Sequence, residues 1–215
     1  RFLGEHVGAQ IASTCADLGL AGQRMLLGAY MRRRTGHLRI ETVDEAPREI
    51  DALLAQRNGR VVSHRSSTWM NWLLRIADPA EQREQRLCLV RAHDGHLVGA
   101  FMIRRRFHDT ASSDGFRNVM LGSLKDHAVF DADQVDVLGL TMLALRELIA
   151  WGVDAAEVCA TNDQDSRALR RLGLAQRGEL HLVCHANPES PLYGNAFAER
   201  SAWWITPAEG DNFFN

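Results

Sequence analysis

The sequence lacks the features that mark several classes of protein. None of its apolar runs approaches the about 20 residues that a membrane-spanning helix needs. Its net charge of -2 gives no general attraction to nucleic acid or to an anionic membrane. Its 4 cysteines are scattered, so they predict buried free thiols in a reducing cytoplasm rather than a disulfide framework. Internal repeats and low-complexity segments are absent as well.

What is present is the composition of an ordinary globular protein, with 46% hydrophobic and 24% charged residues in a chain of 215. Hydrophobic periodicity, caps and turn residues then predict the elements. The predicted helices are 1–34, 47–59, 66–79, 140–152 and 162–174. The predicted strands are 37–43, 86–92, 96–107, 119–130, 156–161, 179–186 and 201–207.

This order of elements predicts a mixed sheet that is mostly antiparallel. His93-Asp94-Gly95 is a hairpin signal between two of the strands. The helix at 140–152 is long enough to cross over, so the strand at 156–161 is expected to be parallel to the strand at 119–130. We therefore predict an α+β fold with one parallel βαβ crossover, in a domain at 37–213 that a helical segment at 1–36 precedes.

The stretch 119–174 is the most informative part for function. It predicts a strand, a turn at 131–139, a helix, a second strand and a short helix. In such units a ligand binds at the carboxyl end of the first strand, facing the amino end of the helix. This turn holds Asp131, Asp133 and Asp136, whose charges oppose a polyanionic ligand.

Several motifs of the chain resemble those of the GNAT superfamily of N-acyltransferases. Near the end of the βαβα unit, that family often has Asn, a small residue, Tyr and then Gly-Phe. This chain has Asn162, Ala168, Leu169 and Gly173-Leu174 in those places. The stretch 59–79 and the late WWIT segment at 203–206 are similar to the tandem GNAT-like domains of bacterial envelope and polysaccharide-associated acyltransferases. The resemblance covers about residues 37–207.

This resemblance implies a fold, a donor and a reaction. The fold would be GNAT-like, and the chain would be the C-terminal half of a longer protein, paired with an N-terminal GNAT-like half or with a second copy in a homodimer. The donor would be an acyl-CoA, and the acyl group would pass to an amine or a hydroxyl. The donor would lie between the strands 119–130 and 156–161, where the implied contacts are Gln134, Val135, Val137, Leu138, Gly139 and Asn162.

The chain departs from the family pattern in two ways. The acyl-CoA loop of the family has several glycines and a Gln or Arg, whereas this turn has one glycine, Gly139, and three aspartates instead of arginines. The tyrosine that often serves as general acid falls on Leu169.

Asp126 is the candidate catalytic base. It has the strand parity of Met120, Leu124, Ala128 and Phe130, so we expect it to project from an apolar face where burial favours proton uptake. The resembled family also places its base on this strand. The alternative is a structural carboxylate that is solvated or paired with Lys125 or an arginine.

Other reactive side chains have simpler structural interpretations. We expect His127 to be a structural or surface histidine and Cys159 to be a buried thiol. His181 and His185 share a strand, which presents too few converging groups for zinc, so no metal site is predicted. Trp69 and Trp72 are expected in the core, or lining an acceptor cleft. The run 104–106 of arginines is expected to be a solvated strand end.

Two further functions stay open at this stage. One is a degenerate GNAT-like module without catalysis that supports a partner domain or a dimer; the acidic turn and the missing tyrosine favour it. The other is a Fem-like aminoacyl transferase that takes its donor from aminoacyl-tRNA. The low net charge and the lack of a concentrated basic groove count against that second function. Neither nucleic acid nor membrane is expected as a partner.

Overall fold

A computed structural model describes residues 28–55, 65–76, 83–108, 118–160 and 163–176. The chain divides into two compact units, Arg1–His37 and Leu38–Asn215. In the first unit residues 28–35 are helical. The predicted strands at 179–186 and 201–207 lie outside the described residues, as does most of the predicted helix at 1–34.

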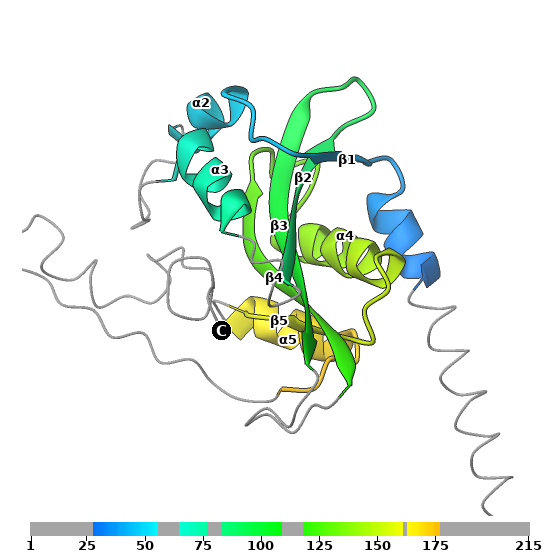
Figure 1. Cartoon of the computed structure of the whole chain (residues 1–215). Coiled ribbons are helices and arrows are strands. Elements are labelled where there is room, and N and C mark those ends of the chain that lie inside the picture. Colours follow the sequence, from blue (N-terminus) through cyan, green and yellow to red (C-terminus); the bar gives the residue numbers. More distant parts are fainter. Residues whose placement is uncertain (1–27, 56–64, 77–82, 109–117, 161–162, 177–215) are drawn as a thin grey trace, which may run out of the picture. The chain divides into compact units, whose positions relative to one another are not determined.

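The second unit contains a sheet of five strands in the order β1-β2-β3-β4-β5 (Figure 1). The strands β1 to β4 pair antiparallel, and β4 pairs with β5 in parallel. The predicted α+β fold with one parallel crossover is thus confirmed. The strands are β1 (Arg39–Val43), β2 (Arg83–Arg91), β3 (Leu97–His108), β4 (Val119–Val129) and β5 (Ala155–Val158). The helices are α2 (Glu49–Ala55), α3 (Ser67–Arg75), α4 (Val137–Ala150) and α5 (Asp163–Arg171).

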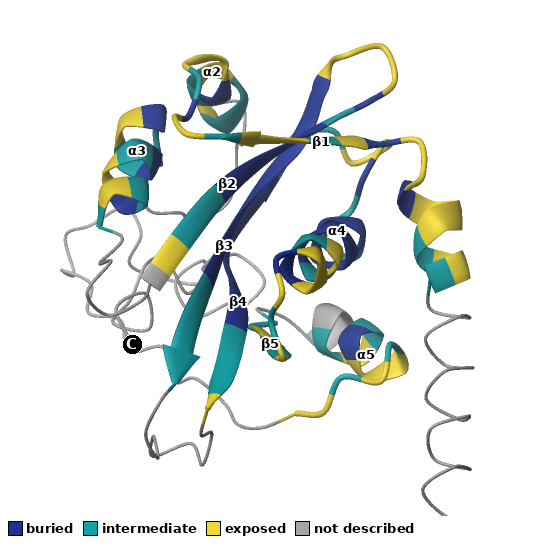
Figure 2. Ribbon diagram, turned by 45° about the vertical axis from the view of Figure 1, so that its right-hand side comes forward, coloured by how far each residue is buried: buried dark blue, intermediate teal, exposed yellow. Residues whose placement is uncertain are grey.

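The sheet separates two hydrophobic clusters, as expected when side chains alternate along strands that are covered on both faces. On β3, Phe101 and Ile103 belong to the cluster that includes Leu143 of α4. Their neighbours Ala100 and Met102 belong to the cluster with α2 and α3. Figure 2 shows that the first part of β3 and one side of α4 are buried, whereas the end of β3 is intermediate and parts of the helices are exposed. The two faces of the sheet are therefore an α4 face and an α2/α3 face.

A β-bulge interrupts the pairing of β3 with β4. Met102 pairs with Asp126 and Ile103 with Leu124, so Lys125 is an extra residue on β4. A bulge shifts the alternation by one residue. Leu124 accordingly packs in the α4 cluster, whereas Asp126 lies opposite Met102 of the α2/α3 cluster. The prediction that Leu124 and Asp126 share a face was wrong, because it assumed strict alternation along a strand that contains this bulge.

Helix α4 includes the turn that precedes the apolar run at 140–152. Asp136 is its N-cap, with extended backbone, and its side chain accepts a hydrogen bond from the N–H of Gly139 at 2.7 Å. An aspartate in this position satisfies an N–H group of the first turn and complements the helix dipole. The helix therefore begins at Val137. One of the three aspartates of the turn thus has a clear role in folding.

Gly122 lets α4 approach β4 closely. A Cβ atom at this position would lie 2.7 Å from Leu148 Cδ2 and 2.9 Å from Val153 Cγ1. We predict that Gly122→Val lowers the free energy of unfolding by about 1–3 kcal/mol, because it overpacks this contact. Urea unfolding measures the change. Glu157→Val on the exposed face of β5 is the control, with an expected change within about 0.5 kcal/mol. Equal effects of the two variants would contradict the prediction.

Candidate functional site

The candidate donor site lies where β4, β5 and α4 meet. Within the described residues β5 pairs with Leu121 to Leu124 of β4, and the last pair is Leu124 with Val158. Beyond that pair β4 continues to Val129 and the chain turns into α4. The sequence prediction that these two strands are parallel neighbours is confirmed. The carboxyl ends of two parallel strands and the amino end of a helix are thereby brought together, which is the usual position of ligands in such units.

The turn before α4 uses its carboxylates within the fold. Asp131 Oδ1 accepts a hydrogen bond from the N–H of Asp133 at 3.0 Å, as in an Asx turn. Asp131 Oδ2 also lies 3.4 Å from Nε2 of His96, at the β2–β3 hairpin. Asp136 caps the helix. Asp133 is exposed, so its charge faces solvent at the amino end of α4.

The predicted donor contacts fall into four groups. The N–H groups of Val135 and Gly139 donate within the chain, to the Asp131 carbonyl at 3.1 Å and to Asp136 Oδ1. Gln134 is exposed. Val137 and Leu138 form the start of α4, where the N–H groups of a helix point out of its first turn. Within the described ranges no hydrogen bond from either N–H group is found. Asn162 lies outside the described residues.

Asp126 is buried rather than open to solvent. Its side chain is 3% exposed, and Oδ1 lies 3.4 Å from Nη2 of Arg65, whose side chain is 2% exposed. Oδ1 also accepts a hydrogen bond from the N–H of His127 at 2.8 Å. The buried guanidinium and carboxylate are thus close enough to form an ion pair. This geometry matches the arginine pairing that the sequence analysis gave as the alternative for Asp126, within a buried setting.

A small cavity borders Asp126. Its volume is about 10 Å³, and its lining includes Met70 of α3, Met102 of β3 and His127. This volume is close to the minimum for one water molecule. The described part of the cavity has an apolar surface, so it offers no polar partners to a water, and it has no room for an acceptor molecule.

Charged side chains gather at the bulge. Arg104, Lys125 and His127 are buried, as are Asp126 and Arg65. Arg104 pairs with Ser123 beside the bulge, so it lies near Asp126 on the sheet. The prediction that arginines 104–106 form a solvated strand end was wrong for Arg104, which is buried. Arg105 is engaged within the fold as well, because its Nη1 donates a hydrogen bond to the Trp151 carbonyl at 2.7 Å.

The remaining candidates have structural roles or lie away from the site. Burial raises the pKa of the Cys88 thiol to about 11, which keeps it protonated and unreactive. Cys159 is half-buried and follows β5 rather than lying in it. Trp72 is 53% exposed, so it does not belong to the core, whereas Trp69 packs against the α2/α3 cluster. Leu169, in the place of the family tyrosine, is buried.

The described ranges contain neither a metal-binding cluster nor a membrane-spanning helix. There no group of three or more His, Cys, Asp or Glu side chains is placed to hold a metal ion. In the same ranges no helix is long and apolar enough to cross a membrane. His181 and His185 lie outside them.

No protein-family model and no curated protein matches the chain. Among solved structures, glucosamine-6-phosphate N-acetyltransferase from Arabidopsis thaliana is similar at 9% identity and a TM-score of 0.46, over 70% of this chain and 99% of that one. Ribosomal-protein-alanine N-acetyltransferase from Brucella melitensis biovar Abortus 2308 is similar at 14% identity and a TM-score of 0.45, over 69% and 99%. An acetyltransferase from Trypanosoma brucei is similar at 13% identity and a TM-score of 0.43, over 68% and 99%. The likeness is one of fold.

Arg65 is the site residue that sequence reasoning missed. It directly precedes Ser66, which caps α3 through a hydrogen bond from the Trp69 N–H at 3.1 Å. An arginine next to a helix cap is common on surfaces, so its burial could not be read from the sequence. The available signal was the need of a buried Asp126 for a cationic partner.

Proposed function

We propose that the chain transfers an acyl group from an acyl-CoA-type thioester to an amine or hydroxyl acceptor. The observation that carries this proposal is the meeting of three elements at one place. The parallel ladder of β4 and β5 ends at Leu124, β4 continues past it through the bulge, and α4 begins at Val137. This arrangement suits a long, narrow donor with its phosphates at the helix end and its thioester along β4.

In this proposal the phosphates of the donor approach the N–H groups of Val137 and Leu138. These groups lie at the positive end of the dipole of a 14-residue helix. Asp133 opposes the same phosphates because its exposed carboxylate carries a like charge. The donor site therefore combines an attractive helix end with a repulsive side chain, and affinity depends on the balance between them.

The proposed reaction takes place at the bulge of β4. The acceptor nitrogen or oxygen attacks the thioester carbonyl carbon, its bond to the acyl group forms, and the carbon–sulfur bond breaks. The acceptor proton passes through a water molecule to the carboxylate of Asp126, and the thiolate takes a proton from solvent. The position of Asp126 at the bulge, with its carboxylate buried, selects it as the proton acceptor in this proposal.

The test of this function uses acetyl-CoA and a panel of primary amines that includes amino acids, aminosugars and polyamines. Release of free thiol is followed with a chromogenic reagent, and the acylated amine is identified by mass spectrometry. Amine-dependent thiol release that saturates with acetyl-CoA is the expected result. Thiol release that is independent of every amine and alcohol tried would contradict the proposal.

The acidic turn yields a prediction about donor affinity. We predict that Asp133→Asn tightens acetyl-CoA binding, most clearly at low salt, because it removes a like charge near the phosphates. Asp136→Asn should act in the same direction while keeping the helix cap, since asparagine caps as well as aspartate does. Asp136→Ala is the matched control, because it loses both the charge and the cap. Calorimetry measures the three affinities, and unchanged or weaker binding by Asp133→Asn would place the phosphates elsewhere.

A second candidate function is a non-catalytic module that supports a partner domain or a second copy of the chain. The observation that favours it is the use of polar groups inside the fold. The N–H groups of Val135 and Gly139 are engaged within the turn, and Asp126 is engaged with Arg65. Absence of acetyl-CoA binding in the same calorimetry would favour this function over the first.

A further inference from the structure

The segment that carries Arg65 is fixed at both of the residues that follow it. Ser66 caps α3, as described above. Ser67 donates from its N–H to Asp51 Oδ1 at 2.6 Å and from its hydroxyl to Asp51 Oδ2 at 2.8 Å. Asp51 belongs to α2. Arg65 therefore directly precedes two residues, Ser66 and Ser67, whose hydrogen bonds join the start of α3 to α2. These bonds define the backbone position of Arg65.

The side chain of Arg65 extends from the start of α3 to the bulge of β4. It lies 3.4 Å from Asp126, and both side chains are almost fully buried. The pair therefore connects the α2–α3 helices with the bulge of β4. The other charged groups at the bulge are Arg104 of β3 and Lys125 and His127 of β4, all buried.

We propose that Arg65 is a positioning residue for the acyl transfer, which holds the Asp126 carboxylate in the orientation that accepts the proton. This inference rests on the proposed function. A carboxylate group can rotate about its bond to the rest of the side chain. In Asp126 two contacts to Oδ1 oppose this rotation: the N–H of His127 within β4, and the guanidinium of Arg65, which directly precedes α3. An error of about 1 Å in the position of a catalytic group can cost about 10²-fold in rate.

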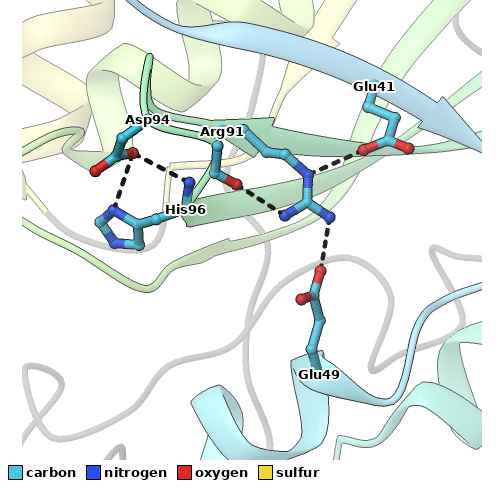
Figure 3. Close-up of polar contacts among 6 residues, drawn as sticks. Glu41, Glu49, Arg91, Asp94 and His96 are labelled. Atoms are coloured by element: carbon cyan, nitrogen blue, oxygen red, sulfur yellow. Dashed lines mark hydrogen bonds and ion pairs between the residues drawn. The ribbon is translucent and has the colours of Figure 1, made fainter.

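Arg91 offers a matched control in the same unit. It also links the sheet to α2, because its Nη2 lies 2.7 Å from Glu49 Oε1, and its Nε lies 3.0 Å from Glu41 Oε2 of β1 (Figure 3). Its side chain is 26% exposed, and those of Glu41 and Glu49 are about half exposed. Solvent screens such pairs, so their removal has small effects.

The experiment compares Arg65→Met, Arg65→Lys and Arg91→Met with the unmodified chain. Thiol release from acetyl-CoA is measured with the amine found above, and the folded fraction of each variant is measured by circular dichroism. We expect Arg65→Met to lose about 10²-fold in kcat per folded molecule with the KM for acetyl-CoA unchanged. Arg65→Lys should recover part of the loss, and Arg91→Met should keep the original kcat.

A double-mutant cycle in urea tests the pair independently of turnover. Arg65→Met and Asp126→Asn should each lower the unfolding midpoint. The double variant should lower it by less than the sum of these two changes, because each single change already removes the interaction. Additive midpoints with retained turnover would overturn this inference and leave the proposed function standing. Non-additive midpoints with kcat per folded molecule unchanged in Arg65→Met would show a structural role only, and so also overturn it. Absence of turnover in the unmodified chain would overturn the proposed function and this inference together.

Discussion

Asp126→Asn is expected to lower turnover of acetyl-CoA by about 10²–10⁴-fold, the usual range for loss of a general base. Asparagine has nearly the shape of aspartate but cannot take up the acceptor proton. Donor binding should persist, because the N–H groups of Val137 and Leu138 are unchanged. The measurement is the steady-state rate of thiol release at saturating acetyl-CoA, expressed per folded molecule.

Stability has to be measured alongside this rate. Asp126 is the carboxylate that the structure pairs with Arg65 in the interior, and removal of one partner of a buried pair costs about 3–5 kcal/mol. Asp94→Asn, at an exposed residue of the β2–β3 hairpin, is the control for loss of a carboxylate. If Asp126→Asn lost activity only in proportion to unfolded protein, Asp126 would be a structural residue and not the base.

Leu143→Ala is expected to lower the free energy of unfolding by about 2–5 kcal/mol. Leu143 is 0% exposed and packs in the cluster between α4 and the sheet. Truncation removes buried methyl groups and leaves a cavity that close neighbours fill only in part. Because α4 carries the N–H groups of the proposed donor site, this core would also position that site. Urea unfolding gives the change, which counts as a stability effect if the m-value is unaltered.

Ile149→Ala in the same helix is the control for this variant. Ile149 is 69% exposed, and alanine favours a helix more than isoleucine does. We expect a change within about 0.5 kcal/mol. Similar losses in the two variants would mean that α4 does not pack on the sheet through the face that contains Leu143.

The sequence predicted the order and pairing of the elements well where periodicity and connection length decide them. The helix between 119–130 and 156–161 is long enough to cross over, so the parallel pairing of β4 with β5 could be inferred. Asp136 was considered only for its charge, whereas the structure shows that it caps α4. A cap signal competes with the charge interpretation whenever an aspartate precedes a helix.

The site was harder to predict because its geometry depends on long-range contacts. The bulge at Lys125 arises from the pairing of β3 with β4, which no local pattern encodes. Strict alternation therefore assigned the right apolar face to Phe130 but the wrong one to Leu124. The partner of Asp126 comes from Arg65, which is far away in sequence and precedes a different helix. An arginine pairing could be anticipated, but the identity of the arginine could not.

The measurement that tests the central claim most directly is a titration of the ¹⁵N-labelled chain with acetyl-CoA, followed by amide NMR. The account predicts saturable shifts at Val137 and Leu138 of α4 and along Lys125 to Val129 of β4, because these residues would contact the phosphates and the thioester arm. The amide signal of Ile149, at the far end of α4, should stay unchanged. Saturable shifts confined to other parts of the chain, or no shifts at millimolar acetyl-CoA, would contradict the assignment of the donor site.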